Sequence, residues 1–363
     1  MDPVKLSQEF IRFNTTTSHE SEIKFAKYII DLLAMEGFEC EILREENHAN
    51  LIITYGKDPD LVFSGHMDTV DAEFEEWSFD PFEPFIKDEK LYGLGSCDMK
   101  SGLACIIAAV MNNRHKMKKG VKMIFTYDEE NGFTGVRHIP KKYFKGKYCV
   151  IAEPSNSVPV NAHKGVTRLI ATTHGKSAHG SRPERGVNAI KKMFDFEFML
   201  SDMNSRIMKK ENRILGPPAF NIGIIKGGQE TNIVPARCDM FFEYRLTPEF
   251  NYEYLKNNMS KLVYSFSKKN PDSKLEVDVQ FNVPSFFNLE PTVFKDKMLE
   301  ICRREDFGHQ RGATEAPFYS AAGLDTLILG PGAHTLHQAN EWIYLSQIRK
   351  CEKYFEKLID AFC

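Results

Sequence analysis

The alternation of short apolar strands with helices is the feature of this 363-residue sequence that most restricts its fold. It occupies both ends of the chain and is interrupted in the middle. The expected strands are 51–55, 61–64, 121–127, 148–152 and 324–329, and the expected helices are 102–114, 292–304 and 345–362. Strand–helix–strand order predicts an α/β domain with a mixed, mostly parallel sheet flanked by helices.

The interruption follows a different order. It gives strand, helix, strand, strand, helix and strand over residues 166–173, 186–200, 219–226, 237–246, 252–267 and 274–281. This order is typical of a ferredoxin-like α+β unit. We therefore predict an inserted domain at 165–281, which divides the first domain into 1–164 and 282–363.

Composition excludes several classes of protein. The net charge of −3 gives no general attraction for nucleic acid or an anionic membrane. The longest apolar run, 103–111, is about half of the roughly 20 residues that span a bilayer. The eight cysteines include no Cys-x-x-Cys pair, which argues against a disulfide scaffold and a thiolate zinc site. With no secretory leader recognised at the first residues, we expect a reduced, cytoplasmic location.

Side chains of the types that commonly bind metal ions follow four predicted strands or precede the helix at 102–114. They are His66, Asp68, Asp98, Glu129, Glu130, Glu153, His334 and His337. Each alone also fits a solvated loop, but ligands bind at the carboxyl ends of strands in open α/β sheets. So many carboxylates would repel one another unless a cation lay among them. Mixed imidazole and carboxylate groups predict zinc, or two metals sharing a bridge, and by spacing alone either His334 or His337 could be a ligand.

Eleven motifs occur in one order along nearly the whole chain. They are SGHMDTV (64–70), GLGSCDMK (93–100), TYDEENG (126–132), AEPS (152–155), AHKG (162–165), AHGSRP (178–183), GVNA (186–189), KGG (226–228), NIVP (232–235), TEA (314–316) and GPG (330–332). In this order they resemble the dizinc aminoacylase and carboxypeptidase family of metallopeptidases. The TEA and AHKG motifs are most similar to its acetylornithine deacetylase branch, which succinyl-diaminopimelate desuccinylases also resemble.

The resemblance implies a ligand set for two divalent ions, zinc first, with cobalt or manganese as alternatives. His66 and Glu153 would hold one ion, Glu130 and His337 the other, and Asp98 would bridge both.

The resemblance also implies roles for residues around the metals. Glu129 would be the general base, and Asp68 would orient the His66 imidazole. His179, in the inserted lid and dimerisation domain, would stabilise the oxyanion in a neighbouring subunit's active site, which requires a homodimer. The expected substrate-binding residues are Asn232, Arg245, Thr314 and Glu315.

The expected function is therefore metal-dependent hydrolysis of a small N-acyl amino acid. The first expectation is N2-acetyl-L-ornithine, giving L-ornithine and acetate in arginine biosynthesis. N-acetylcitrulline deacetylation, succinyl-diaminopimelate hydrolysis, or dipeptidase or carboxypeptidase activity would use the same metal centre. An inactive binding protein is a further alternative, but every expected ligand and the base are present.

Overall fold

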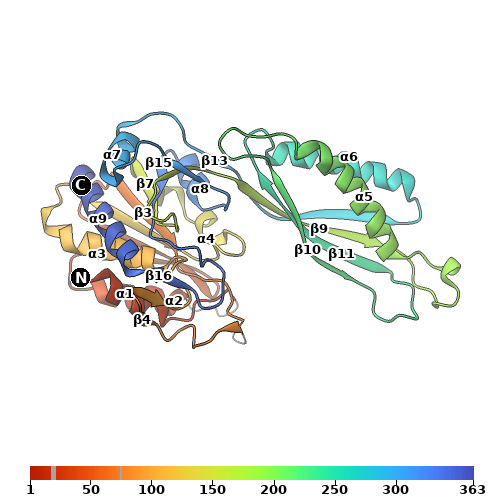
Figure 1. Cartoon of the computed structure of the whole chain (residues 1–363), viewed down its shortest axis with the longest axis horizontal. Helices are drawn as coiled ribbons and strands as arrows, with labels where there is room; N and C mark the ends of the chain where they lie inside the picture. The colour runs from red at the N-terminus through yellow and green to blue at the C-terminus, as the bar shows by residue number, and fades with distance from the viewer. Residues whose placement is uncertain (18–21, 74–75) are drawn as a thin grey trace. The chain divides into compact units, whose positions relative to one another are not determined.

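The computed structural model describes residues 1–17, 22–73 and 76–363. The chain forms two compact units (Figure 1). Unit 1 comprises residues 1–161, 288–308 and 314–363, and unit 2 comprises 162–287 and 309–313. The expected insertion at 165–281 lies within unit 2.

The larger sheet is mixed, with a parallel centre. Strands β6, β3, β7 and β15 lie side by side in that order and run parallel, whereas the outer pairs are antiparallel. The full order is β1 (Glu39–Glu45), β2 (His48–Tyr55), β6 (Val121–Thr126), β3 (Leu61–His66), β7 (Tyr148–Ile151), β15 (Asp325–Ile328), β8 (Val160–His163) and β13 (Phe286–Phe287), with β14 (Gly308–Gln310) paired to β8. The predicted α/β class is confirmed.

Helices cover both faces of the parallel centre. Successive side chains of a strand point to opposite faces. On β3, Phe63 packs against Phe355, with ring centroids 5.0 Å apart, while the next residue, Ser64, meets the Tyr319 hydroxyl at 2.5 Å. Phe355 belongs to α9 (Leu345–Phe362) and Tyr319 to α8 (Ala316–Ala321), so these helices lie on opposite faces. The other α-helices described in unit 1 are α1 (Pro3–Ile11), α2 (Glu22–Leu33), α3 (Lys100–Asn113), α4 (Thr134–Arg137) and α7 (Val293–Cys302).

Helix α3 is buried along nearly its whole length. It packs against α1 and α9, and its residue Gly102 lies against the end of β7. A Cβ at Gly102 would lie 2.5 Å from the carbonyl oxygen of Ala152, so only glycine permits this approach. The close packing brings the segment before α3 next to the carboxyl ends of the parallel strands.

A second, small sheet in unit 1 joins segments that are far apart in sequence. It has the order β16 (Trp342–Tyr344), β5 (Lys90–Tyr92), β4 (Phe85–Lys87). Trp342 pairs with Tyr92. The sequence predicts none of these three-residue strands, because strands this short show no periodic pattern.

Unit 2 contains the predicted ferredoxin-like arrangement. Its antiparallel sheet has the order β10 (Ala219–Gly227), β11 (Arg237–Leu246), β9 (Gly165–His174), β12 (Lys274–Val283). Helices α5 (Ala189–Ile207) and α6 (Tyr252–Lys269) pack on it over a separate hydrophobic core. Helix α5 begins three residues later than predicted, because Asn188 caps its first turn by accepting the Lys191 N–H.

Within the described part of the chain, no helix has both the length and the apolar character needed to cross a membrane.

Candidate metal centre

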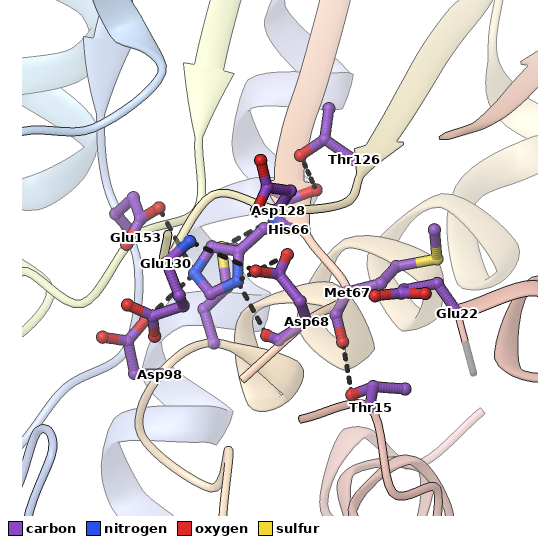
Figure 2. A network of polar contacts seen from close by, with 12 residues as sticks. Thr15, Glu22, His66, Met67, Asp68, Asp98, Thr126, Asp128, Glu130 and Glu153 are labelled. Atoms are coloured by element: carbon purple, nitrogen blue, oxygen red, sulfur yellow. Dashed lines mark hydrogen bonds and ion pairs between the residues drawn. The ribbon is translucent and has the colours of Figure 1, made fainter. Parts of the chain in front are cut away.

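The parallel strands bring the predicted ligands to one edge of the sheet. His66 is the last residue of β3, Glu129 and Glu130 follow β6, and Glu153 follows β7. Because β6, β3 and β7 are parallel neighbours, these side chains emerge at the same edge. Figure 2 shows Glu130 and Glu153 beside His66.

The two nitrogens of the His66 ring have different surroundings. Nδ1 lies 2.9 Å from the backbone carbonyl oxygen of Asp68, which can only accept a hydrogen bond. Nδ1 therefore carries the proton, and Nε2 is left as the ligand atom. Nε2 lies 3.1 Å from Asp98 Oδ1 and 3.6 Å from Glu153 Oε1. The carboxylate of Asp68 is farther from Nδ1, at 3.7 Å, so the orienting contact comes from its backbone.

Asp98 lies between two histidines. Its Oδ1 faces His66, and its Oδ2 lies 3.4 Å from His337 Nε2. The same His337 nitrogen is 3.1 Å from Glu130 Oε2. Asp98 therefore has one oxygen toward each of two groups of potential ligands, as a carboxylate that bridges two ions must.

Glu129 belongs to the first of these groups. Ligand atoms of His66, Glu129 and Glu153 lie within 4.8 Å of one another, and so do those of His66, Asp98 and Glu130. Glu129 is only 7% exposed. Both consecutive carboxylates therefore lie near His66, Glu129 together with Glu153 and Glu130 together with Asp98.

Burial and like charge make this cluster costly without a cation. Burial, reinforced by neighbouring carboxylates, raises the pKa of Glu129 and Glu153 well above the usual range. Hydrogen bonds with Asp98 and Glu130 raise the pKa of His337 to about 11. Glu153 Oε1 accepts no hydrogen bond within the described ranges. Carboxylate and imidazole donors suit divalent ions of the zinc type, so the residues fit the expected metals.

Backbone contacts hold the strand ends together. Asp68 Oδ2 accepts the Glu130 N–H at 3.1 Å, which joins the segments after β3 and β6. The Met67 N–H donates to the Thr126 carbonyl at 2.8 Å. The Thr15 hydroxyl donates to the Met67 carbonyl at 2.7 Å (Figure 2). Asp68 thus positions both its own strand end and that of the neighbouring strand.

Comparison with known proteins assigns the family. Residues 62–361 match the peptidase family M20/M25/M40. The chain belongs to this family. An acetylornithine deacetylase from Buchnera aphidicola subsp. Schizaphis graminum is 31% identical over 375 residues, covering 99% of this chain and 98% of that protein.

Solved structures share the M20 fold. Aminopeptidase PepT from Bacillus cereus superposes with a TM-score of 0.76 at 24% identity, covering 99% of this chain and 97% of its own. A Bacillus subtilis protein described as a dinuclear metal-binding peptidase of the M20 family has a TM-score of 0.66 at 14% identity, covering 99% and 97%. The predicted family is therefore confirmed: the chain is an M20 metallohydrolase.

Two residues expected to bind substrate in this M20 protein lie in the interior of unit 1. Thr314 is buried, and its hydroxyl accepts the Ala316 N–H at 3.1 Å in the first turn of α8. Glu315 has no exposed surface, and burial raises its pKa to about 7. Contact between Glu315 and a substrate ammonium would require a path that this structure does not open.

The other three predicted residues belong to unit 2. His179 and Asn232 come together, because the Gly180 N–H donates to the Asn232 carbonyl at 2.6 Å. His179 is exposed, and its Nδ1 accepts the Ser181 N–H at 3.1 Å, so Nε2 carries the proton of the neutral ring. Arg245 pairs with Glu243 at 2.8 Å. Arg237 stands at the end of β11 nearer His179, and Arg245 lies eight residues farther along the strand. At ~3.3 Å per residue, this separation is roughly 26 Å.

Sequence reasoning missed one buried carboxylate at this site. Glu341 accepts backbone hydrogen bonds from Gly95, Cys97 and Asp98. A glutamate in a polar segment after His337 carries no periodic or motif signal that would separate it from a solvated loop residue.

Proposed function

We propose that the chain hydrolyses the acetyl amide of N2-acetyl-L-ornithine, giving L-ornithine and acetate in arginine biosynthesis. The observation that carries this proposal is the position of Asp98 between His66 and His337, with the buried Glu129 beside them. Identity of 31% to an acetylornithine deacetylase across 99% of the chain supports this substrate over others that the same centre could cleave.

Five side chains form the proposed metal-binding set. We propose that His66 and Glu153 hold one ion, Glu130 and His337 the other, and Asp98 both. Zinc is the proposed metal, with cobalt and manganese as alternatives that suit the same donors. When bound, the two cations polarise the amide carbonyl and lower the pKa of water toward ~7.

Glu129 is the proposed general base. It takes a proton from the attacking water and delivers that proton to the departing amine. The surroundings of the two glutamates favour this assignment. Glu130 contacts the proposed ligand His337, whereas Glu129 lies beside His66 and Glu153. The charge of bound cations would favour the ionised Glu129 that accepts a proton, against the effect of burial.

Unit 2 supplies the remaining proposed groups. The Nε2–H of His179 is available to donate a hydrogen bond to the oxyanion of a second subunit's reaction, which requires a homodimer formed through this unit. Asn232, next to His179, and Arg245 are the proposed contacts for the substrate's polar groups. Arg245 would have to exchange its partner Glu243 for the substrate carboxylate.

A substrate panel tests the proposal. The purified protein is assayed with N2-acetylornithine, N-acetylcitrulline, succinyl-diaminopimelate and a dipeptide, and the metal content is measured on the same sample. We expect two metal ions per chain and the highest kcat/KM with acetylornithine. A higher kcat/KM with another compound would identify that compound as the better substrate and contradict the acetylornithine assignment. Two bound ions with no turnover of any compound would favour the inactive binding protein.

A further inference from the structure

Glu341 is a buried carboxylate whose contacts all lead to the segment that carries Asp98. It is 1% exposed. Its Oε1 accepts the N–H groups of Cys97 at 2.5 Å and Asp98 at 3.0 Å, and its Oε2 accepts the N–H of Gly95 at 2.9 Å. Burying a carboxylate is costly, and three backbone donors offset part of that cost here.

These contacts join two loops that each carry a proposed ligand. We call residues 93–99 the bridging loop, because it carries Asp98, and residues 330–341 the histidine loop, because it carries His337. The Gly93 N–H donates to the Glu341 carbonyl at 3.0 Å, and the Ala333 N–H donates to the Cys97 sulfur at 3.2 Å. Both the side chain and the backbone of Glu341 therefore connect the loops.

The connection has a fixed base. Glu341 immediately precedes β16 and Gly93 immediately follows β5, and these strands pair through Trp342 and Tyr92. The bridging loop turns sharply between this base and α3, since Gly95 has a φ of +82°. A Cβ at Gly95 would lie 2.9 Å from Cδ of the buried Lys100. These contacts fix the backbone conformation of the bridging loop, which ends with Asp98 and Met99 before α3.

We propose that Glu341 is a positioning residue that fixes Asp98 relative to His337 before the metal ions arrive. This proposal rests on the proposed function, in which two metal ions are bound. It adds the residue that sets the distance between the bridging ligand Asp98 and the ligand His337. The Asp98 side chain contacts His66 at 3.1 Å and His337 at 3.4 Å, and both histidines are themselves proposed ligands. The three backbone N–H groups that donate to Glu341 hold the loop independently of those ligands, so the bridge is already in place for binding.

Metal binding by the apo protein tests this assignment in the Glu341→Gln variant. The amide oxygen of glutamine can keep the bonds from Cys97 and Asp98, but its NH₂ group meets the Gly95 N–H as a second donor. We expect metal affinity to fall by about 10- to 100-fold for at least one of the two ions, as is typical when an outer hydrogen-bond partner of a ligand is lost. The absorption spectrum of the Co²⁺-substituted protein should also change.

A matched substitution elsewhere in unit 1 provides the control. Asp325 begins β15, at the end of that strand away from the site. It accepts a hydrogen bond from Asn288 at 2.9 Å and forms an ion pair with Lys295 at 3.1 Å. Asp325→Asn makes the same chemical change and should lower the Tm without altering metal affinity or the Co²⁺ spectrum. Wild-type affinity and spectrum in a folded Glu341→Gln variant would overturn the proposal, while leaving the proposed function intact. Failure of the wild-type protein to bind two ions would instead contradict the proposed function.

Hydrogen exchange in the unsubstituted protein gives a second test that needs no variant to fold. The amides of Gly95, Cys97 and Asp98 should exchange slowly in the metal-free protein, because Glu341 already accepts their hydrogen bonds. Adding Zn²⁺ should then change the protection of this peptide little. Rapid exchange in the apo protein, with protection gained only on adding Zn²⁺, would show that the metal orders the loop and would overturn the proposal.

Discussion

At the scale of single residues, the consecutive carboxylates Glu129 and Glu130 do different work because neighbouring side chains diverge. Glu130 contacts His337, and its backbone N–H is held by Asp68. Glu129 instead lies with His66 and Glu153. A base must remain free to take and release a proton, whereas a ligand must keep its lone pair on a cation. The divergence lets one strand end provide both.

This division predicts the effect of removing Glu129. Glu129→Ala should lower kcat by about 10²- to 10⁴-fold or more, because the general base is lost, and leave two metal ions per chain. Glu153→Ala is the matched comparison from the same cluster, and should lose metal as well as turnover. Turnover close to wild type in Glu129→Ala, with metal retained, would remove Glu129 from the mechanism.

The residues of the site differ in how far the sequence could predict them. His66, Glu130 and Glu153 follow strands whose apolar runs are evident, so their convergence follows from the parallel order. The three contacts of Glu341 depend on a turn at Gly95 and on pairing between segments about 250 residues apart. Local pattern carries no information on such pairing, which is why Glu341 was missed.

At the scale of elements, the sequence predicts long periodic segments well and short or charged segments poorly. Helix α9 begins and ends at the predicted residues, Leu345 and Phe362, because its apolar residues recur at helical spacing along one face. Strand β1 (Glu39–Glu45) was not predicted. It lies at the edge of the larger sheet, and its charged, mostly exposed sequence shows no apolar alternation.

The edges of the unit 2 sheet lead to a prediction about assembly. Strand β12 carries Lys274, Glu276 and Asp278, charges that oppose pairing with another strand. The opposite edge, β10, instead exposes apolar side chains, including Ile224 and Ile225. We therefore expect the proposed homodimer to form along β10.

Paired substitutions on the two edges test this expectation. Ile225→Glu should convert the dimer to a monomer in sedimentation experiments, and kcat should fall because His179 of a second subunit is lost, while metal content stays the same. Val279→Glu on β12, where the native side chain is 41% exposed, should leave both unchanged. A monomeric wild-type protein, or a fully active monomeric Ile225→Glu variant, would contradict dimerisation through β10.

At the scale of the whole molecule, each unit has its own hydrophobic core. The core of unit 1 gathers residues from both ends of the chain, such as Phe10 and Phe355, around the parallel strands. The core of unit 2 lies between its sheet and its two helices and includes Phe196 and Phe266. All five proposed metal ligands belong to unit 1. Metal binding should therefore stabilise one core and leave the other almost unaffected.

Calorimetry of the apo and metal-loaded protein tests this separation. We expect two unfolding transitions, of which only one responds to metal. A site at a free metal concentration of 1,000 times its Kd gains about 4 kcal/mol, which corresponds to a Tm increase of roughly 8–16 °C for a unit of this size. Relief of repulsion among buried Glu129, Glu130 and Glu153 is the physical source of the gain. Because EDTA removes the metal ions, adding it should return the Tm of the unit 1 transition, and of that transition alone, to its value in the apo protein. Equal shifts of both transitions would mean that the two cores unfold as one cooperative unit. A shift of the unit 2 transition alone would place the metals outside unit 1, and no shift of either would mean that metal does not stabilise the folded protein.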